Sequence, residues 1–94
     1  SLARMHYNKK NFEEAIKSYK LALGVNSYDP SSWFTLGICH MALKQMDEAL
    51  KCFSQSVSID ESQGEAWGNL ASCYIALKKF SEAYMTLEQA VKYC

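Results

Sequence analysis

Residues 33–44 read WFTLGICHMALK and residues 67–78 read WGNLASCYIALK, and the two stretches match at an offset of 34 residues. The match extends beyond them, and its identical pairs include Trp33 with Trp67, Leu36 with Leu70, Cys39 with Cys73, Lys44 with Lys78, Glu48 with Glu82 and Ala49 with Ala83. Residues 2–17 fall one further step back, with the start of that copy missing. A period of this length is typical of repeat arrays, so we expect three copies with the first truncated.

The length of 94 residues suits such an array. A small single-core domain would be marginally stable, whereas each repeat of a solenoid buries its apolar face on its neighbours. Roughly three repeats are needed for a stable stack. The apolar share of 49% is consistent with this arrangement.

Apolar residues recur at steps of three and four within each copy, which indicates amphipathic helices. Asp29 followed by Pro30 is a helix-start signal, and Asn11 with Glu14 resembles a capping box. No segment alternates with period two, so the predicted class is all-α. Six helices are expected, over residues 2–8, 12–25, 30–43, 47–59, 64–77 and 81–93. The short connections between them require antiparallel neighbours.

Charge and hydropathy exclude several kinds of partner. Ten acidic and ten basic residues cancel and are interspersed, which argues against nucleic acid as a partner. No stretch reaches the roughly 20 apolar residues of a membrane span, and no charged start followed by an apolar core and a cleavage site suggests a secretory signal. We therefore expect no membrane partner and a location in the cytoplasm, with the nucleus as a second compartment.

Chemistry-bearing motifs are absent from the sequence. The four cysteines form no CxxC pair, and neither His6 nor His40 lies at metal-ligand spacing to them. Cys39 and Cys73 occupy the same position of successive copies, where a small apolar side chain fits between helices. His40 lies on an apolar stripe and is expected to be a hydrogen-bonded packing residue. We predict no catalytic residue, metal, cofactor or enzymatic activity.

The pattern resembles the tetratricopeptide repeat (TPR) family over essentially the whole chain. The residues that carry the resemblance are Leu2, Ala3, His6, Ala15, Tyr19 and Ala22, then Trp33, Leu36, Gly37, His40, Ala49 and Phe53, then Trp67, Leu70, Ala71, Tyr74, Ala83 and Leu87. The resemblance implies an α-solenoid, a right-handed superhelix of antiparallel helix pairs. Its repeats would span residues 1–29, 30–63 and 64–94 as one array, part of a larger protein. More narrowly, the stretches over residues 28–43 and 66–77 resemble the eukaryotic tetratricopeptide repeat protein 27 family.

The resemblance also implies a concave groove lined by the first helix of each repeat, where members of the family bind peptides or helices. By register, the inward-facing positions are Arg4, Tyr7 and Asn8, then Ser31, Phe34, Thr35, Ile38 and Met41, then Glu65, Gly68, Asn69, Ser72 and Ile75. Of these, the expected partner-binding residues are Tyr7, Phe34, Ile38, Met41, Gly68, Ser72 and Ile75.

Phe34, Ile38 and Gly68 suggest how this groove would work. Phe34 and Ile38 stand where one TPR subclass has the lysine and asparagine that grip an acidic chaperone tail, so that role is disfavoured. A recess beside Gly68 would admit an apolar side chain of a partner. In the alternative, Phe34 folds over Gly68 and fills the recess itself.

The sequence is therefore compatible with two functions. The first is a scaffold segment that binds a protein partner in the groove. The second is a spacer or self-association element of a longer superhelix. Because the chain stops as the last helix ends, Tyr84, Leu87 and Val91 are expected to face a missing neighbour, and the isolated chain is expected to self-associate.

Overall fold

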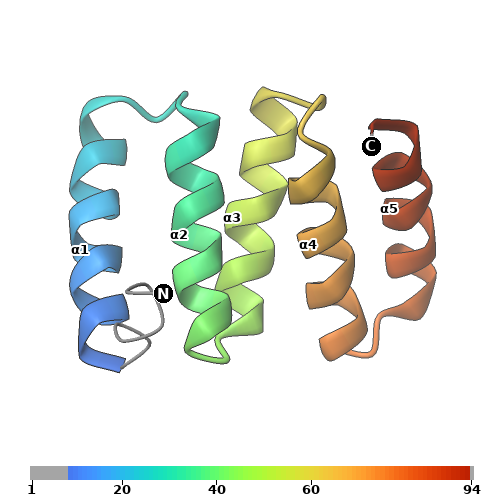
Figure 1. Ribbon diagram of the computed structural model, residues 1–94, viewed down its shortest axis with the longest axis horizontal. Helices are drawn as coiled ribbons and strands as arrows, with labels where there is room; N and C mark the ends of the chain where they lie inside the picture. Colours follow the sequence, from blue (N-terminus) through green and yellow to red (C-terminus); the bar gives the residue numbers. More distant parts are fainter. Residues whose placement is uncertain (1–8, 94) are drawn as a thin grey trace, which may run out of the picture.

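Five α-helices make up the computed structural model, which describes residues 9–93. The helices are α1 (Lys9–Val25), α2 (Pro30–Ala42), α3 (Met46–Ile59), α4 (Gly64–Ala76) and α5 (Phe80–Tyr93). They stand side by side in chain order, and each runs antiparallel to the next (Figure 1). The described residues contain no strand, which agrees with the all-α prediction. The first of the six expected helices, over residues 2–8, lies outside the described residues.

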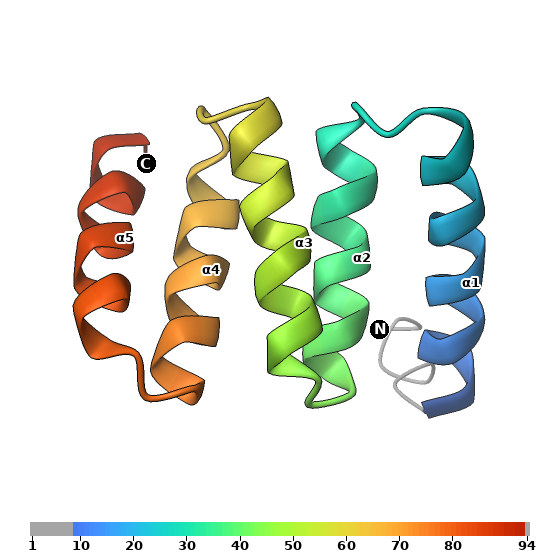
Figure 2. The same ribbon diagram turned by 180° about the vertical axis from the view of Figure 1, so that it is seen from behind.

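The connections alternate between the two ends of the row. The α1–α2 and α3–α4 loops lie at one end, and the α2–α3 and α4–α5 turns lie at the other, as the view from behind also shows (Figure 2). Helix contacts are extensive only between neighbours in the chain, namely α1 with α2, α2 with α3, α3 with α4 and α4 with α5. Each helix is therefore stabilised by its neighbours, as in a quasi-one-dimensional stack.

The prediction for the start of α1 was wrong. The helix is already formed at Lys9 rather than beginning at residue 12, so Asn11 lies inside it and does not cap it. Lysine has a good helix propensity, and no glycine or proline interrupts the chain before Gly24. No helix-breaking residue therefore interrupts the helix before residue 12, where it was expected to begin. The other helix boundaries agree with the sequence prediction to within one residue.

The start of α2 follows the predicted capping pattern. The Asp29 carboxylate accepts hydrogen bonds from the backbone N–H of Ser31 (3.1 Å) and the hydroxyl of Ser32 (2.8 Å). Pro30 occupies the first helical position, where a backbone N–H would have no partner within the helix. The cap thus satisfies one of the free amides and fixes where α2 begins.

Lys44 and Lys78 end α2 and α4 in the same way. Both adopt a left-handed backbone conformation, with φ values of 64° and 62°. In the first turn the N–H of Lys44 donates to the carbonyl of Met41 (3.0 Å), and the N–H of Gln45 donates to the carbonyl of His40 (2.8 Å). Lys78 and Lys79 repeat both bonds, to Ile75 and Tyr74. This pair of bonds is the Schellman motif, which reverses the chain within three residues.

The core lies where α2, α3 and α4 meet. Its buried residues are Ala49, Phe53, Val57, Ala66, Leu70 and Cys73. Phe53 is completely buried, and its ring lies so close to Gly37 that a Cβ there would be 2.9 Å from ring carbons. A second cluster of Leu23, Leu36 and Cys52 joins α1 to α2 and α3. Within residues 9–93, no helix is both long and apolar enough to cross a membrane.

Helix α5 has apolar side chains that no described element covers. Tyr84, Leu87 and Val91 are 67%, 43% and 77% exposed. The positions one period earlier in α3 are Leu50, Phe53 and Val57, which pack in the core between α2 and α4. The exposure predicted for these three residues is therefore confirmed.

Candidate functional site

Helix α2 presents two different stripes to its surroundings. Ser31, Phe34, Thr35 and Ile38 share one stripe, and Trp33, Leu36 and His40 share another. At about 100° per residue, the two stripes point in nearly opposite directions. A separate cavity lies on each side, so α2 forms part of the walls of both.

The first cavity, about 520 Å³, lies where α2 and α4 begin, and the end of α5 closes one side. We give the name α2–α4 groove to this cavity together with the predicted partner-binding residues of α2 and α4. Of those predicted residues, only Phe34 lines the cavity itself. The cavity is lined by Ser31, Phe34, Thr35, Gln63, Gly64, Glu65 and Tyr93. Among the described residues that line the cavity, Glu65 is the only one with a charged side chain, and it is exposed.

The three predicted residues of α2 are only partly available to a partner. Phe34, Ile38 and Met41 are each half-buried and pack against the core. The edge of one ring of the Phe34–Phe53 pair meets the face of the other, with ring centroids 5.6 Å apart and planes at 70°. Pairs of this geometry contribute roughly 0.5–1.5 kcal/mol beyond the area that they bury. Phe34 therefore lines the cavity and also packs against the core.

The three predicted residues of α4 are more open. A Cβ added at Gly68 would have no neighbour within 4 Å, so Phe34 does not cover this glycine. Ser72 is exposed and its hydroxyl donates to the carbonyl of Gly68 (3.2 Å), while Ile75 is 47% exposed. The alternative in which Phe34 folds over Gly68 is thus wrong. The remaining predicted residue, Tyr7, lies outside the described residues.

Sequence reasoning missed three lining residues of the cavity, Gln63, Gly64 and Tyr93. Register arguments select positions inside the first helix of each repeat, whereas Gln63 precedes α4 and Tyr93 ends α5. A signal was available, because the start of α4 and the end of an antiparallel α5 must lie at the same end of the row. The tip of α5 therefore had to be near the groove.

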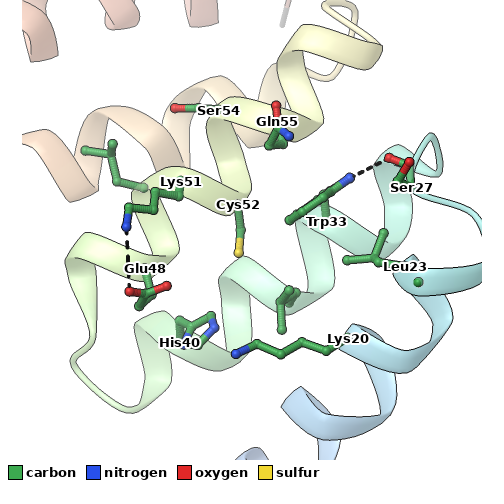
Figure 3. Close-up of a pocket in the computed structure, with 13 residues that line it drawn as sticks. Lys20, Leu23, Ser27, Trp33, His40, Glu48, Lys51, Cys52, Ser54 and Gln55 are labelled. Atoms are coloured by element: carbon green, nitrogen blue, oxygen red, sulfur yellow. Dashed lines mark hydrogen bonds and ion pairs between the residues drawn. The ribbon is translucent and has the colours of Figure 1, made fainter.

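A second cavity, about 760 Å³, lies between α1 and α3 over the other stripe of α2, and we call it the α1–α3 cavity (Figure 3). Trp33 forms one wall, and its indole N–H donates to the carbonyl of Ser27 (2.9 Å). Trp67 makes the equivalent bond to Glu61 (2.8 Å). Both tryptophans thus hold the loop that precedes their helix.

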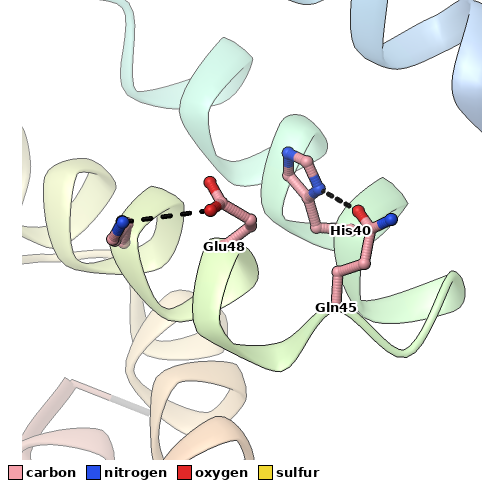
Figure 4. Close-up of polar contacts among 4 residues, drawn as sticks. His40, Gln45 and Glu48 are labelled. Atoms are coloured by element: carbon pink, nitrogen blue, oxygen red, sulfur yellow. Dashed lines mark hydrogen bonds and ion pairs between the residues drawn. The ribbon is translucent and has the colours of Figure 1, made fainter.

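His40 is buried at the far end of the same stripe. Its Nδ1 atom lies 2.7 Å from the side-chain oxygen of Gln45, in the turn between α2 and α3 (Figure 4). The bond ties the end of α2 to the residue before α3. The predicted role of His40, a hydrogen-bonded packing residue, is confirmed.

Three cysteines, Cys39, Cys52 and Cys73, are buried free thiols. Burial raises the pKa of Cys52 and of Cys73 to about 11, and it also raises the pKa of Cys39. Thiols with raised pKa values are poor nucleophiles at neutral pH. Among the described residues, no group of three or more His, Cys, Asp or Glu side chains could hold a metal ion.

The row of antiparallel helix pairs, the 34-residue period and the Schellman turns together define an α-solenoid of the TPR class. The chain belongs to the family described as anaphase-promoting complex, cyclosome, subunit 3, whose model matches residues 8–90. No curated protein sequence matches the chain significantly.

Solved structures with the same fold include TPR proteins with bound peptides. The Yersinia enterocolitica type III secretion chaperone SycD, in complex with a peptide of the translocator YopD, is 25% identical, with a TM-score of 0.86 over 98% of this chain and 70% of that one. The second TPR of Spaghetti (RPAP3), bound to the HSP90 peptide SRMEEVD, is 19% identical, with a TM-score of 0.85 over 89% and 78%. MamA is 18% identical, with a TM-score of 0.84, and the chain spans 48% of it.

Proposed function

We propose that the chain is a segment of a protein–protein interaction scaffold that holds a peptide or helix of a partner in the α2–α4 groove. The observation that supports this most directly is the unfilled space beside Gly68, next to the half-buried side chains of Phe34 and Ile38. A recess with an apolar wall can bury an apolar side chain of a partner, which is the basis of helix-in-groove recognition. Met41, Ser72 and Ile75 would extend the contact along the groove.

The solved complexes support the same role at the level of the fold. SycD and Spaghetti each hold a peptide, from a translocator and from HSP90 respectively. The low identity to Spaghetti carries over only the architecture, not its ligand.

The segment that binds in this groove is proposed not to be an acidic tail. The HSP90 peptide SRMEEVD ends in two glutamates, a valine and an aspartate. In the α2–α4 groove, Phe34 and Ile38 offer no positive charge, and Glu65 would repel a carboxylate. An apolar side chain is the better match for this surface.

Other parts of the proposal concern the parent protein. We assign residues 1–29, 30–63 and 64–94 to three repeats of one array, within a larger protein of the cytoplasm or nucleus. The likeness to the tetratricopeptide repeat protein 27 family is not supported by the family match and stays a prediction. No enzymatic activity is proposed.

The proposal can be tested with variants that change the groove without disturbing the core. Phe34→Glu is a poor choice because Phe34 packs on Phe53. Gly68→Leu places a side chain in open space, and Ile75→Glu adds charge at a half-exposed position. Both variants should fail to capture proteins that the wild-type chain captures from a cell extract. Their melting temperatures should stay near that of the wild type.

Gly24→Leu is the matched control, because Gly24 also faces open space but lines the α1–α3 cavity. If the Gly68→Leu and Ile75→Glu variants are folded and still capture the same proteins as the wild type, the groove is not the binding surface.

A second candidate function is a spacer or self-association element, which the exposed apolar face of α5 favours. Tyr84, Leu87 and Val91 would then contact the next helix of a longer superhelix or a second copy. In that case, groove variants would leave assembly unchanged and substitutions on α5 would abolish it.

A further inference from the structure

The α1–α3 cavity lies on the side of α2 opposite the groove and is independent of the proposed function. Its floor is apolar and combines Leu23 of α1, Leu36 of α2 and Leu50 of α3 with the indole of Trp33. The volume of about 760 Å³ falls within the range of known ligand-binding cavities, roughly 300–1,000 Å³. Three helices build this site, so it is a preformed hollow and not a loop that has to close.

Small side chains keep the cavity open. A Cβ added at Gly24 would meet no atom within 4 Å, although Gly24 lines the cavity. Another lining residue, Cys52, is a small residue on the α3 side. One period later these two positions carry Ser58 and Thr86, and the position of His40 carries Tyr74. The larger residues would narrow an equivalent hollow, so the opening is a property of this pair of repeats.

The rim of the cavity carries a positive charge that no described residue neutralises. Lys20 extends from α1 across the mouth toward His40, and Lys51 lies on the α3 side (Figure 3). Lys51 pairs with Glu48 at 3.9 Å, and both side chains are more than half exposed, so the pair is weak. Among residues 11–93 no ion pair engages Lys20, and Glu48 is the only acidic residue in the lining.

We propose that the α1–α3 cavity is a second docking site, for a helix of a partner protein that presents a leucine-sized side chain with a carboxylate one turn away. The apolar side chain would lie on Leu23, Leu36 and Trp33, and the carboxylate would reach the ammonium of Lys20. Helices α1 and α3 run in the same direction on either side of α2 (Figure 1), and the cavity lies between them. A partner helix could therefore pack over α2 between these two helices. The site would let the chain hold two partners on opposite faces.

Trp33 provides a specific readout, because it lines the cavity whereas Trp67 does not. In a Trp67→Phe background, its fluorescence is titrated with two designed helical peptides that share the same leucines. One peptide carries a glutamate one turn from each leucine, and the other carries a lysine at the same positions. The glutamate peptide should change the Trp33 emission and bind at least about tenfold more tightly than the lysine peptide. Equal affinities, or no change with either peptide, would overturn the proposal.

Two variants locate the binding. Gly24→Leu should fill the cavity and weaken the glutamate peptide by at least about tenfold, and Lys20→Glu should reverse the preference between the peptides. Gly68→Leu and Lys17→Glu are the matched controls, in the groove and on an exposed position of α1 outside the lining, and should leave the affinity unchanged. Peptide affinity lost in Gly68→Leu but kept in Gly24→Leu would assign the peptide to the groove and contradict the second site. Circular dichroism of each variant separates lost binding from lost folding.

Discussion

Gly37 and Gly68 both lie inside helices, yet their surroundings are opposite. At Gly37 an added Cβ would come within 2.9 Å of the Phe53 ring, which is completely buried and has no free side to move toward. At Gly68 an added Cβ would meet nothing within 4 Å. Gly37 is required by packing, whereas Gly68 faces open space.

Alanine at these two positions should therefore change stability in opposite directions. We expect Gly37→Ala to lower the free energy of unfolding by roughly 1–3 kcal/mol, because the core would be overpacked. Gly68→Ala should raise it by about 0.5–1 kcal/mol, because alanine is the better helix former. Urea denaturation of the two variants and the wild type measures both. A Gly37→Ala variant at least as stable as the wild type would contradict the close packing of Phe53 on Gly37, and a destabilised Gly68→Ala variant would contradict the open space at Gly68.

The buried thiols predict how stability depends on pH. Burial raises the pKa of Cys52 and Cys73 from 9.0 to about 11, so the native state holds these protons more tightly than the unfolded chain does. Their contribution to the free energy of unfolding is fully present below about pH 9 and is lost as the pH rises through about 11. The loss amounts to at most about 3 kcal/mol for each thiol.

Thermal melts between pH 8 and pH 11 can isolate this effect. The wild type should lose stability over that range more steeply than a Cys52→Ala/Cys73→Ala double variant, in which the lysine and tyrosine titrations remain. Parallel curves for the two proteins would contradict a contribution of the thiols.

Residue-level predictions succeeded where one position determines its own role. His40 was expected to be hydrogen-bonded because a buried imidazole needs a partner, and this is confirmed. Whether Phe34 covers Gly68 was left open, because the answer depends on the neighbouring side chain, and an added Cβ at Gly68 meets no atom within 4 Å. The partner Gln45 was not predicted, because the geometry of the turn decides which side chain arrives there. That Phe34 packs on Phe53 also depends on the spacing of α2 and α3, which the pattern alone does not give.

At the scale of the element, Lys44 and Lys78 are the unusual residues. A non-glycine residue in the left-handed region costs roughly 1–2 kcal/mol, and both turns accept this cost while forming the two Schellman hydrogen bonds. Both lysine side chains are exposed, so the side chain itself makes no buried contact.

Glycine in these turns should therefore stabilise the protein. We expect Lys44→Gly and Lys78→Gly each to raise the free energy of unfolding by about 0.5–1 kcal/mol, because the relief of strain exceeds the added entropy of the unfolded chain. The double variant should show the sum, since the two turns are separate. Lys79→Gly, outside the left-handed position, should be neutral or destabilising. If all three lysine-to-glycine substitutions lower the melting temperature, strain is not what distinguishes Lys44 and Lys78.

Helix boundaries were predicted well where a strong local signal marks them and poorly where it does not. Asp29 and Pro30 define the start of α2 through a hydrogen bond and a fixed φ angle, and both are legible in the sequence. Asn11 carries a similar chemical signal but lies inside α1, because good helix formers precede it. A capping residue acts only where the chain already leaves the helix, which depends on the neighbouring turn.

For the whole molecule, the exposed face of α5 predicts self-association. Tyr84 and Val91 would be buried by any helix that packs as α4 packs on α3. We expect the apparent mass in light scattering to rise with concentration, and Val91→Lys with Tyr84→Lys to restore a monomer. Lys substitutions at Ser81 and Glu88, also exposed on α5, are the controls. A wild-type chain that stays monomeric at millimolar concentration would contradict this prediction.

The most direct test of the central claim is quantitative capture from a cell extract by four immobilised proteins: the wild type, Gly68→Leu, Ile75→Glu and Gly24→Leu. If the α2–α4 groove holds the partner, at least one protein should be recovered equally by the wild type and Gly24→Leu and at least about tenfold less by both groove variants. Equal recovery of every captured protein by all four, with all four folded, would contradict the groove as the binding site.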